Sequence, residues 1–403
     1  MEIKKSTRID WLVVFILIIY PVILASLAVW YSSQYGIGAF EIVFGIGAYY
    51  LANISVGLGY HRLWAHGAYR TNKVVEFFLA LLTAGTLQGP VLIWASDHQW
   101  HHAFTDQPED PHSPTKYKSK LLGFLWSHMG WMLVGNYLGK KINKVTMTRL
   151  GKNKILVWQF KYYWQLATFM NTLLPALIGY LVGGSWQYAV AGYIFIGIGR
   201  AIQQQMTFCV NSVLHFTGTR KYSESTARDV WWLALFLLGE NWHNFHHAFA
   251  KDYRNGHKWY HFDVHKWLIA LMAKLGLAWD LICTPIERIE AKRQETQRIA
   301  VSSFLTKLQL IEAAASKLAE AASQKLMSAE KSKNQLTGHL KLKLKSVEES
   351  AKKLADRAKE LLASSEAFEE EFIHNAMKKL RDLEQIAISI GLKTMNISKS
   401  LSY

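Results

Sequence analysis

An uncharged run of twenty residues, 11–30, limits what this chain can fold into more than any other feature. At about 1.5 Å per residue, a helix of that length covers the roughly 30 Å hydrocarbon core of a bilayer. The run is too long for a signal-peptide core, and no small-residue cleavage site follows it. Three further runs are long enough to cross: 42–58, 163–182 and 186–210, the last carrying Arg200 near one end. The sequence therefore predicts an all-α integral membrane protein with four transmembrane helices.

A fifth apolar run, 74–94, is interrupted by Gln88, Gly89 and Pro90. If this run crossed the membrane, the histidines before it and those after it would lie on opposite faces and could not share a site. We therefore expect it to turn back rather than to cross.

Charge placement predicts which side the loops face. No acidic residue lies between Asp110 and Glu224, whereas ten Lys or Arg residues lie between Lys116 and Lys161. Because cytoplasmic loops are enriched in Lys and Arg, the histidine-bearing loops are predicted to face the cytoplasm. The net charge of +16 would also suit a nucleic-acid-binding protein, but the apolar runs favour a multi-pass membrane protein with basic aqueous surfaces. Two cysteines, Cys209 and Cys283, imply no disulfide framework.

Histidines recur at helical spacing just beyond the predicted spans. In an α-helix, positions i, i+3 and i+4 lie on one face, which the patterns HQWHH (98–102) and HNFHH (243–247) both satisfy. Asn211 and His215 have the same i, i+4 relation, whereas His61 and His66 are five apart, so we expect a helix end or turn there. The candidate metal ligands are Asn211 and His61, His66, His98, His101, His102, His215, His243, His246 and His247.

Nine imidazoles are more than one four- to six-coordinate ion can use, so the pattern predicts two metal ions. Ligand chemistry alone leaves iron, zinc, copper and nickel open. Zinc hydrolysis needs far fewer histidines, and a histidine-rich pair beside membrane spans favours redox chemistry on a lipid-soluble substrate. The histidines outside the repeats are expected to be ordinary hydrogen-bonded residues: His112, His128, His257, His261 and His265.

Four motifs together carry a family resemblance: HRLWAH (61–66), DHQWHH (97–102), NSVLH (211–215) and GENWHNFHH (239–247). They resemble the histidine boxes of the membrane fatty acyl desaturases, the stearoyl-CoA (delta-9) branch in particular, and the similarity runs from about residue 10 to about residue 282. The resemblance implies a cytosolic helical cap above the four spans, with two irons held by the nine histidines and by Asn211 through a water. It also implies O2-dependent insertion of a cis double bond, delta-9 by analogy, into a saturated fatty acyl chain.

The resemblance further assigns Gln88, Trp94 and Thr207 to the lining of a substrate tunnel. Asp97 matches an acidic position near the head-group site, although it could instead orient a ligand histidine. The electrons would come from a separate donor protein such as a ferredoxin, a rubredoxin or a b-type cytochrome.

Departures from the acyl-CoA desaturases leave the acyl carrier open. Ser96 stands where those enzymes have an arginine, and Gly135 and Asn136 stand where they have a basic pair. Lys140, Lys141 and Lys144 are candidates to replace them, since lysine binds phosphate as a point charge, but a basic loop attracted to anionic lipid is the alternative. We expect acyl-CoA as the carrier, with an acyl-lipid as the alternative.

Composition divides the chain into a desaturase membrane and cap domain, 1–284, and a charged helical tail, 285–403. Apolar residues alternate by three and four over 301–322 and again over 340–361, with Gly338 between the two runs. This predicts two long helices that form a hairpin or an intermolecular coiled coil, the latter allowing self-association; a solvated, partly helical tail is the alternative. No HPGG haem signature occurs there, in keeping with a separate electron donor.

Rival functions predict different features. A fatty-acid or alkane hydroxylase would use the same histidines and differ only in substrate placement. A metal transporter needs ionisable groups along its spans, whereas these spans hold little beyond Glu41 and Arg200. A membrane scaffold acting through the tail would not need nine matched histidines.

Overall fold

The protein is described from a computed structural model, which covers residues 9–134, 143–331, 338–363 and 370–389. The chain divides into two compact units, Met1–Arg293 and Gln294–Tyr403. The sequence-based boundary at 284/285 lies just before α17 (Ile286–Lys331), and the division between the units falls inside that helix.

Among the described residues of the first unit, three helical segments are long and apolar enough to cross a membrane: Trp11–Tyr35, Ala39–Ala65 and Tyr163–Gly183. They correspond to three of the four predicted spans. Each contains a π-helical stretch. The segments are built from α1 (Trp11–Val14), η1 (Phe15–Ile19) and α2 (Tyr20–Tyr35); from α3 (Ala39–Ser55) and η2 (Val56–Ala65); and from α10 (Tyr163–Thr168), η5 (Phe169–Leu173) and α11 (Leu174–Gly183).

The fourth predicted span is also a helix, α12 (Trp186–Asn211), but its composition is less apolar because it carries Arg200 and the glutamines 203–205. It packs closely on its neighbours through glycines. A Cβ at Gly199 would lie 2.0 Å from the carbonyl oxygen of Gly45 in α3, so only glycine allows the two backbones this approach. Whether α12 crosses the membrane stays a prediction.

Region 74–94 is not one continuous helix. It folds as two helices of 13 residues each, α4 (Lys73–Gly85) and α5 (Val91–Ala103), both shorter than the roughly 20 residues that a span needs. Between them the backbone turns through Leu87 (φ 54°) and Gly89 (φ 96°). The interruption agrees with the expectation that this run turns back.

The remaining elements of the first unit are short. Two strands, β1 (Arg70–Thr71) and β2 (Ala278–Trp279), pair antiparallel and join the segment after the first histidine motif to the end of the unit. The helices are α6 (Lys120–Leu125), η3 (Trp126–Gly130), α7 (Trp131–Leu133), α8 (Lys144–Leu150), α9 (Lys154–Lys161), α13 (Val213–Phe216), η6 (Trp231–Leu233), α14 (Ala234–Leu237), α15 (His243–Ala248) and α16 (Val264–Lys274).

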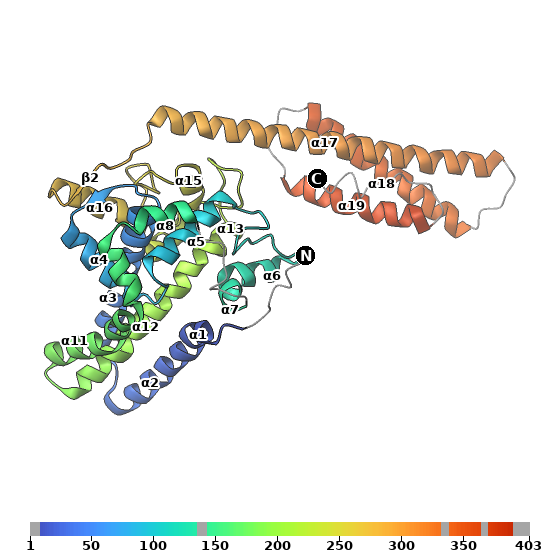
Figure 1. Ribbon diagram of the computed structural model, residues 1–403. Coiled ribbons are helices and arrows are strands. Elements are labelled where there is room, and N and C mark those ends of the chain that lie inside the picture. Colours follow the sequence, from blue (N-terminus) through green and yellow to red (C-terminus); the bar gives the residue numbers. More distant parts are fainter. Residues whose placement is uncertain (1–8, 135–142, 332–337, 364–369, 390–403) are drawn as a thin grey trace, which may run out of the picture. The chain divides into compact units, whose positions relative to one another are not determined.

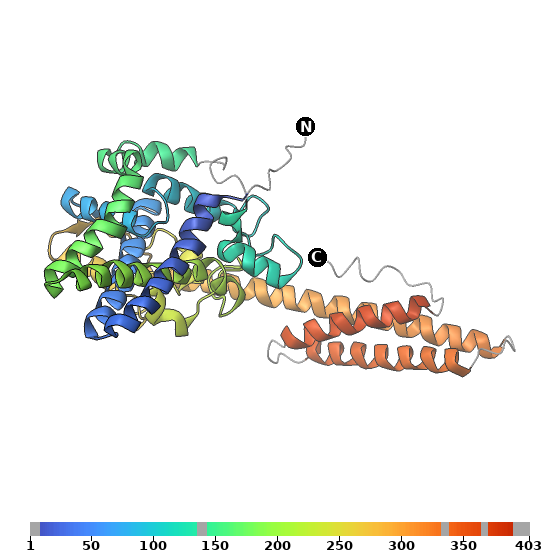
Figure 2. The same ribbon diagram turned by 90° about the horizontal axis from the view of Figure 1, so that it is seen from below.

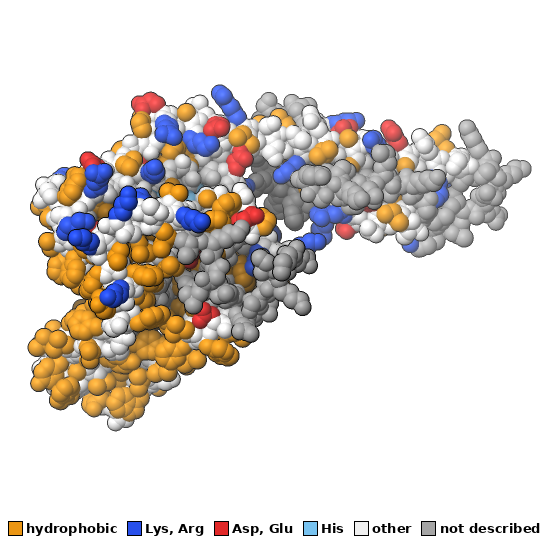
Figure 3. Space-filling model, viewed as in Figure 1, with side chains coloured by type: hydrophobic (Ala, Val, Ile, Leu, Met, Phe, Trp, Pro, Cys, Tyr) orange, Lys and Arg blue, Asp and Glu red, His pale blue; other side chains and the backbone are white. Residues whose placement is uncertain are grey.

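The surface of the first unit is divided by polarity. Exposed hydrophobic side chains gather over the end formed by α2, α11 and α12, and Lys, Arg, Asp and Glu gather over the opposite end (Figure 3). Leu181 and Val182 at the apolar end are 70% and 64% exposed. So large an apolar surface is rare on proteins that are not embedded in a membrane or a partner, and it supports membrane insertion of this end.

The second unit is a bundle of three helices, α17, α18 (Gly338–Ala363) and α19 (Glu370–Ser389) (Figures 1 and 2). Most positions of the two predicted apolar repeats are buried, among them Leu308 and Ile311 of α17 and Leu344 and Leu354 of α18. The prediction of two helices was incomplete, because α19 adds Leu380 and its neighbours to the same core.

Candidate metal centre

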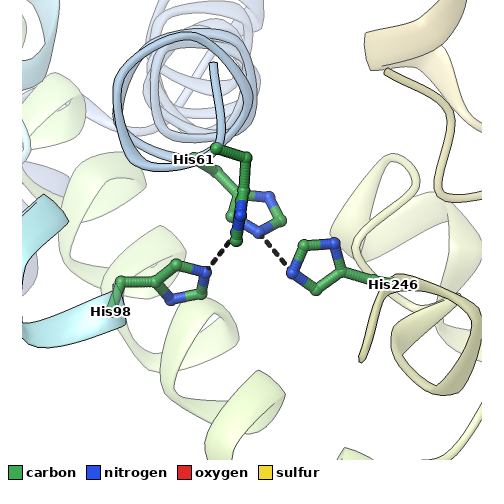
Figure 4. Close-up of side chains that lie close together, drawn as sticks. His61, His98 and His246 are labelled. Carbon is green, nitrogen blue, oxygen red and sulfur yellow. Dashed lines mark hydrogen bonds between the residues drawn. The ribbon is translucent and has the colours of Figure 1, made fainter. Parts of the chain in front are cut away.

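One group of four histidines gathers ring nitrogens from three segments. His61 lies in η2 and His66 caps the end of η2, whereas His98 lies in α5 and His246 in α15. The four ligand atoms all lie within 4.8 Å of one another. The Nε2 atoms of His61 and His246 are 3.0 Å apart, and those of His66 and His98 are 2.8 Å apart. Figure 4 shows the rings of His61, His98 and His246 pointing toward a common point.

A second group contains His101, His215, His243 and His247. The Nε2 atom of His243 lies 3.2 Å from that of His215 and 3.1 Å from that of His247. His102 stands between the groups. Its Nε2 atom is 2.9 Å from that of His246, and its ring stacks on His247 with 4.6 Å between the centroids.

These separations fit shared metal ions. Two nitrogens that each lie about 2.1 Å from one ion at a right angle are about 3.0 Å apart. Four imidazoles with free nitrogens at this spacing form a ligand set for one ion, and the two groups form sets for two. The structure therefore brings all nine predicted histidines together, and the set suits the metals for which imidazole is a common ligand.

The five-residue spacing of His61 and His66 is explained by the π-helix. In η2 the backbone bond joins residues five apart, and the N–H of His66 donates to the carbonyl of His61 at 3.1 Å, so the two side chains lie one above the other. The helix does end at His66, as expected. Close packing of this π-helix depends on Gly57, where a Cβ would lie 2.2 Å from the ring of His265.

The other motifs are held by α-helices, as their spacing predicted, with one interruption. His98, His101 and His102 lie in α5, and α15 begins at His243. Asn211 is the last residue of α12, and Ser212 separates it from α13, which carries His215. The expected single i, i+4 face of Asn211 and His215 is thus split between two helices.

Side chains behind the rings orient them. His61 Nδ1 lies 2.7 Å from Glu240 Oε2, His101 Nδ1 lies 3.0 Å from Asp110 Oδ2, and His215 Nδ1 lies 2.7 Å from Thr226 Oγ1. A donor bond from Nδ1 leaves the Nε2 lone pair for a metal. Sequence reasoning did not assign these three partners, although Glu240 stands inside the quoted motif GENWHNFHH.

Asp110 and His112 also come close enough to His101 to hold a cation. Because His101 presents Nδ1 to this carboxylate and Nε2 to the second histidine group, we interpret Asp110 as its orienting partner. Burial raises the pKa of Asp110, but His101 and His112 outweigh burial and hold the pKa below its ordinary value. Asp110 is therefore ionised at neutral pH.

Seven of the ligand imidazoles are neutral at neutral pH. Burial, and then the neighbouring imidazoles, hold the pKa of these seven well below the ordinary value of a histidine. Neutral imidazole is the form that binds a metal. The seven are His66, His98, His102, His215, His243, His246 and His247.

A cavity of about 660 Å³ opens beside the two groups. The predicted tunnel residues Gln88, Trp94 and Thr207 line it together with Asp97 and Asn211. Much of the remaining wall is apolar and comes from α1, η1, α9 and α10. The metal-side wall is formed by His61, His98, His112 and His243.

The positions that bear on the acyl carrier are only partly covered. Ser96 is buried, and its Oγ accepts a hydrogen bond from the backbone N–H of Asn143 at 2.7 Å. Lys144 opens α8 and is exposed. Gly135, Asn136, Lys140 and Lys141 lie outside the described residues.

A helical membrane protein with two four-histidine groups beside a largely apolar cavity belongs to the class of histidine-rich membrane metalloproteins. The family model for fatty acid desaturases matches residues 39–282, more than half of the chain. The chain therefore belongs to the fatty acid desaturase family.

Three relatives of the chain are named for different acyl carriers. A probable acyl-CoA desaturase of Schizosaccharomyces pombe is 34% identical over 251 residues, which are 62% of this chain and 50% of that protein. Delta-9 acyl-lipid desaturase 1 of Arabidopsis thaliana is 33% identical over 58% of this chain and 72% of its own length. A hex-5-enoyl-[acyl-carrier protein] acetylenase of Moorena producens is 32% identical over 64% of this chain and 82% of its own length. The chain thus spans half the length of the first of these relatives.

Proposed function

We propose that this protein uses two irons and O2 to insert a cis double bond, at the delta-9 position, into a saturated fatty acyl chain. The observation that carries the proposal is the convergence of two four-histidine groups on one elongated, largely apolar cavity. A bound iron pair would supply oxygen activation and hydrogen abstraction, which side chains cannot perform. The nine histidines would be the ligands, with Asn211 completing the set from the cavity wall.

The chain's own residues would bind and place the substrate. The apolar wall suits a hydrocarbon, and Gln88, Trp94 and Thr207 form its polar stretch beside the histidines. Trp94 stacks on His98 with 5.0 Å between ring centroids, so whatever contacts Trp94 lies next to a metal ligand. Asp97 would contribute to binding of the head-group side.

The carrier we propose is acyl-CoA, with an acyl-lipid as the alternative. Relatives named for an acyl-CoA, an acyl-lipid and an acyl-carrier-protein substrate match at 34%, 33% and 32% identity, so identity alone does not favour one carrier. The electrons would come from a separate ferredoxin, rubredoxin or b-type cytochrome. The proposed topology has four spans, with the histidines facing the cytoplasm and the tail available for self-association.

Expression in a host without desaturases, followed by mass spectrometry of the cellular fatty acids, tests the reaction and the position of the double bond together. We expect a monounsaturated product that is lost in His98→Ala and His243→Ala, one from each histidine group. His128→Ala is the matched control, because its ring bonds to Ser212 and Gln205 rather than to a ligand histidine. A product containing added oxygen would identify a hydroxylase instead.

Purified protein then tests the metal and the carrier. We expect two irons per chain, and desaturation when the acyl chain is offered on coenzyme A. Offering acyl-carrier protein and phospholipid in parallel decides between carriers, and activity on phospholipid alone would overturn the acyl-CoA assignment.

A further inference from the structure

Three consecutive glutamines, Gln203, Gln204 and Gln205, lie in the largely apolar α12. Gln203 and Gln204 are fully buried. A buried amide costs free energy on the order of 2 kcal/mol or more unless its hydrogen bonds are made. Outside α12, Gln203 and Gln204 bond to the turn 86–88 between α4 and α5, whereas Gln205 bonds to His128 in η3, so the run connects α12 to two separate parts of the first unit.

Gln203 connects three residues of the cavity wall. Its Nε2 donates to Thr207 Oγ1 at 2.6 Å, and its Oε1 accepts from Gln88 Nε2 at 3.4 Å. Gln88 Oε1 in turn accepts from Trp94 Nε1 at 3.3 Å. Gln203 lies behind the wall, whereas its three linked residues face the cavity. The buried amide of Gln203 thus fixes which atoms donate and which accept in a row of hydrogen bonds. The row ends at the indole of Trp94, which stacks on His98.

The backbone that carries Gln88 is fixed by other groups. Gln204 Nε2 donates to the carbonyls of Thr86 and Leu87 at 2.9 and 3.2 Å. Leu87 has φ 54°, a left-handed conformation that costs a non-glycine residue about 1–3 kcal/mol and persists only where neighbours hold it. With the backbone held in this way, the orientation of the Gln88 side chain depends on Gln203.

The geometry points to Gln203 as a specificity-determining positioning residue. By fixing Gln88 and Thr207 in the wall, it determines which pair of methylenes of a bound acyl chain lies opposite the histidine groups. Neighbouring methylenes are chemically alike, so a shift of about 1 Å in the chain is enough to change which pair reacts. This inference rests on the proposed desaturase function and adds to it the residue that selects the position of the double bond.

The test is the distribution of double-bond positions in the fatty acids of a desaturase-free host that expresses each variant. Gln203→Leu fills most of the space of the side chain but loses both hydrogen bonds, and we expect the share of neighbouring positional isomers to rise at least tenfold. Gln203→Glu should restore the wild-type distribution, because a buried carboxyl is held neutral and then donates to Thr207 and accepts from Gln88. The ratio of isomers does not depend on how much protein folds.

Gln205→Leu is the matched control, since Gln205 makes its bond to His128 and not to Gln88. It should leave the distribution unchanged. An unchanged distribution in Gln203→Leu, or an equal broadening in Gln205→Leu, overturns the inference. If Gln203→Leu yields no folded protein, Gln203→Asn decides, because the shorter amide cannot reach both partners and an unchanged distribution there is equally contrary. A wild-type chain that makes no unsaturated product refutes the proposed function and this inference with it.

Discussion

The carboxylate of Glu240 offers the sharpest test of the metal centre. Its two oxygens face four donors: His61 Nδ1 at 2.7 Å and Asn255 Nδ2 at 2.8 Å on Oε2, and His265 Nδ1 at 3.0 Å and Arg62 Nη2 at 3.1 Å on Oε1. Burial raises the pKa of Glu240, but the contacts with His61 and Arg62 outweigh burial and hold the pKa well below its ordinary value. The group is therefore ionised, accepts hydrogen bonds from Asn255, His265 and Arg62, and has His61 Nδ1 in close contact.

Glu240→Gln keeps the shape of this side chain but replaces one acceptor with an NH2 group. Whichever way the amide turns, its NH2 group meets two of the four donors, so two contacts are lost. Partners of this kind typically contribute 10- to 100-fold to metal affinity, which corresponds to about 1.4–2.7 kcal/mol. Arg62 keeps Asp263, whose two oxygens lie 3.0 and 3.2 Å away, so we expect the fold to survive.

The measurement is the metal content of the purified variant across a titration with ferrous iron, together with its unfolding temperature with and without metal. Glu76→Gln is the matched control. Glu76 is an equally buried carboxylate that bonds to Trp64 and Lys73 rather than to an imidazole. Wild-type metal affinity in Glu240→Gln, or an equal loss in Glu76→Gln, would refute the reasoning.

Three further predictions concern packing, the tail and acid. The added methyl group of Gly57→Ala would lie 2.2 Å from the ring of His265 and should lower the free energy of unfolding by about 1–3 kcal/mol. Gly47→Ala, which has nothing within 4 Å of the added methyl group, should lower it little. A chain ending at Arg293 should keep desaturation and iron content if the tail serves association, and loss of activity at normal iron content would contradict this. Burial, then Lys258 and Arg254, lower the pKa of His257 to about 4. As the pH falls, His257 of the unfolded chain therefore binds a proton before His257 of the folded chain does. The free energy of unfolding should fall by up to about 1.4 kcal/mol per pH unit below about pH 6.5. His257→Leu should reduce this loss in unfolding curves measured from pH 7 to 5.

The sequence predicted which histidines the structure brings together but not how they divide into two groups. Within HQWHH, His98 joins one four-histidine group and His101 joins the other. The three positions share one helical stripe, but that stripe is about 100° wide, and its two edges face different neighbours. Which neighbour faces which edge depends on the packing of α5 against η2 and α15, and no local pattern encodes that packing.

Two other features could not be predicted from the sequence pattern, for physical reasons. A π-helix has no strong sequence signal, so the spacing of His61 and His66 indicated only a helix end. Side chains that orient imidazoles come from turns and need no periodicity, as Thr226 shows: it accepts from His215 and donates to Asp106. In the tail, α19 was missed because the two earlier apolar repeats already accounted for a hairpin, although its buried positions Ala376, Leu380, Leu383 and Ala387 keep the same three-and-four spacing.

The fourth predicted span shows how a site can weaken the sequence signal of its own scaffold. The mean hydropathy of a segment is highest when all its residues are apolar, yet α12 carries Gln203, Gln204 and Thr207 in the region of the cavity. Every one of these polar groups is bonded to protein, which is the condition under which a membrane segment tolerates them. The residues that lower the hydropathy of α12 are therefore among those that order the cavity wall. Where a span lines a reaction site, the pairing of its polar side chains is a better guide to membrane insertion than their number.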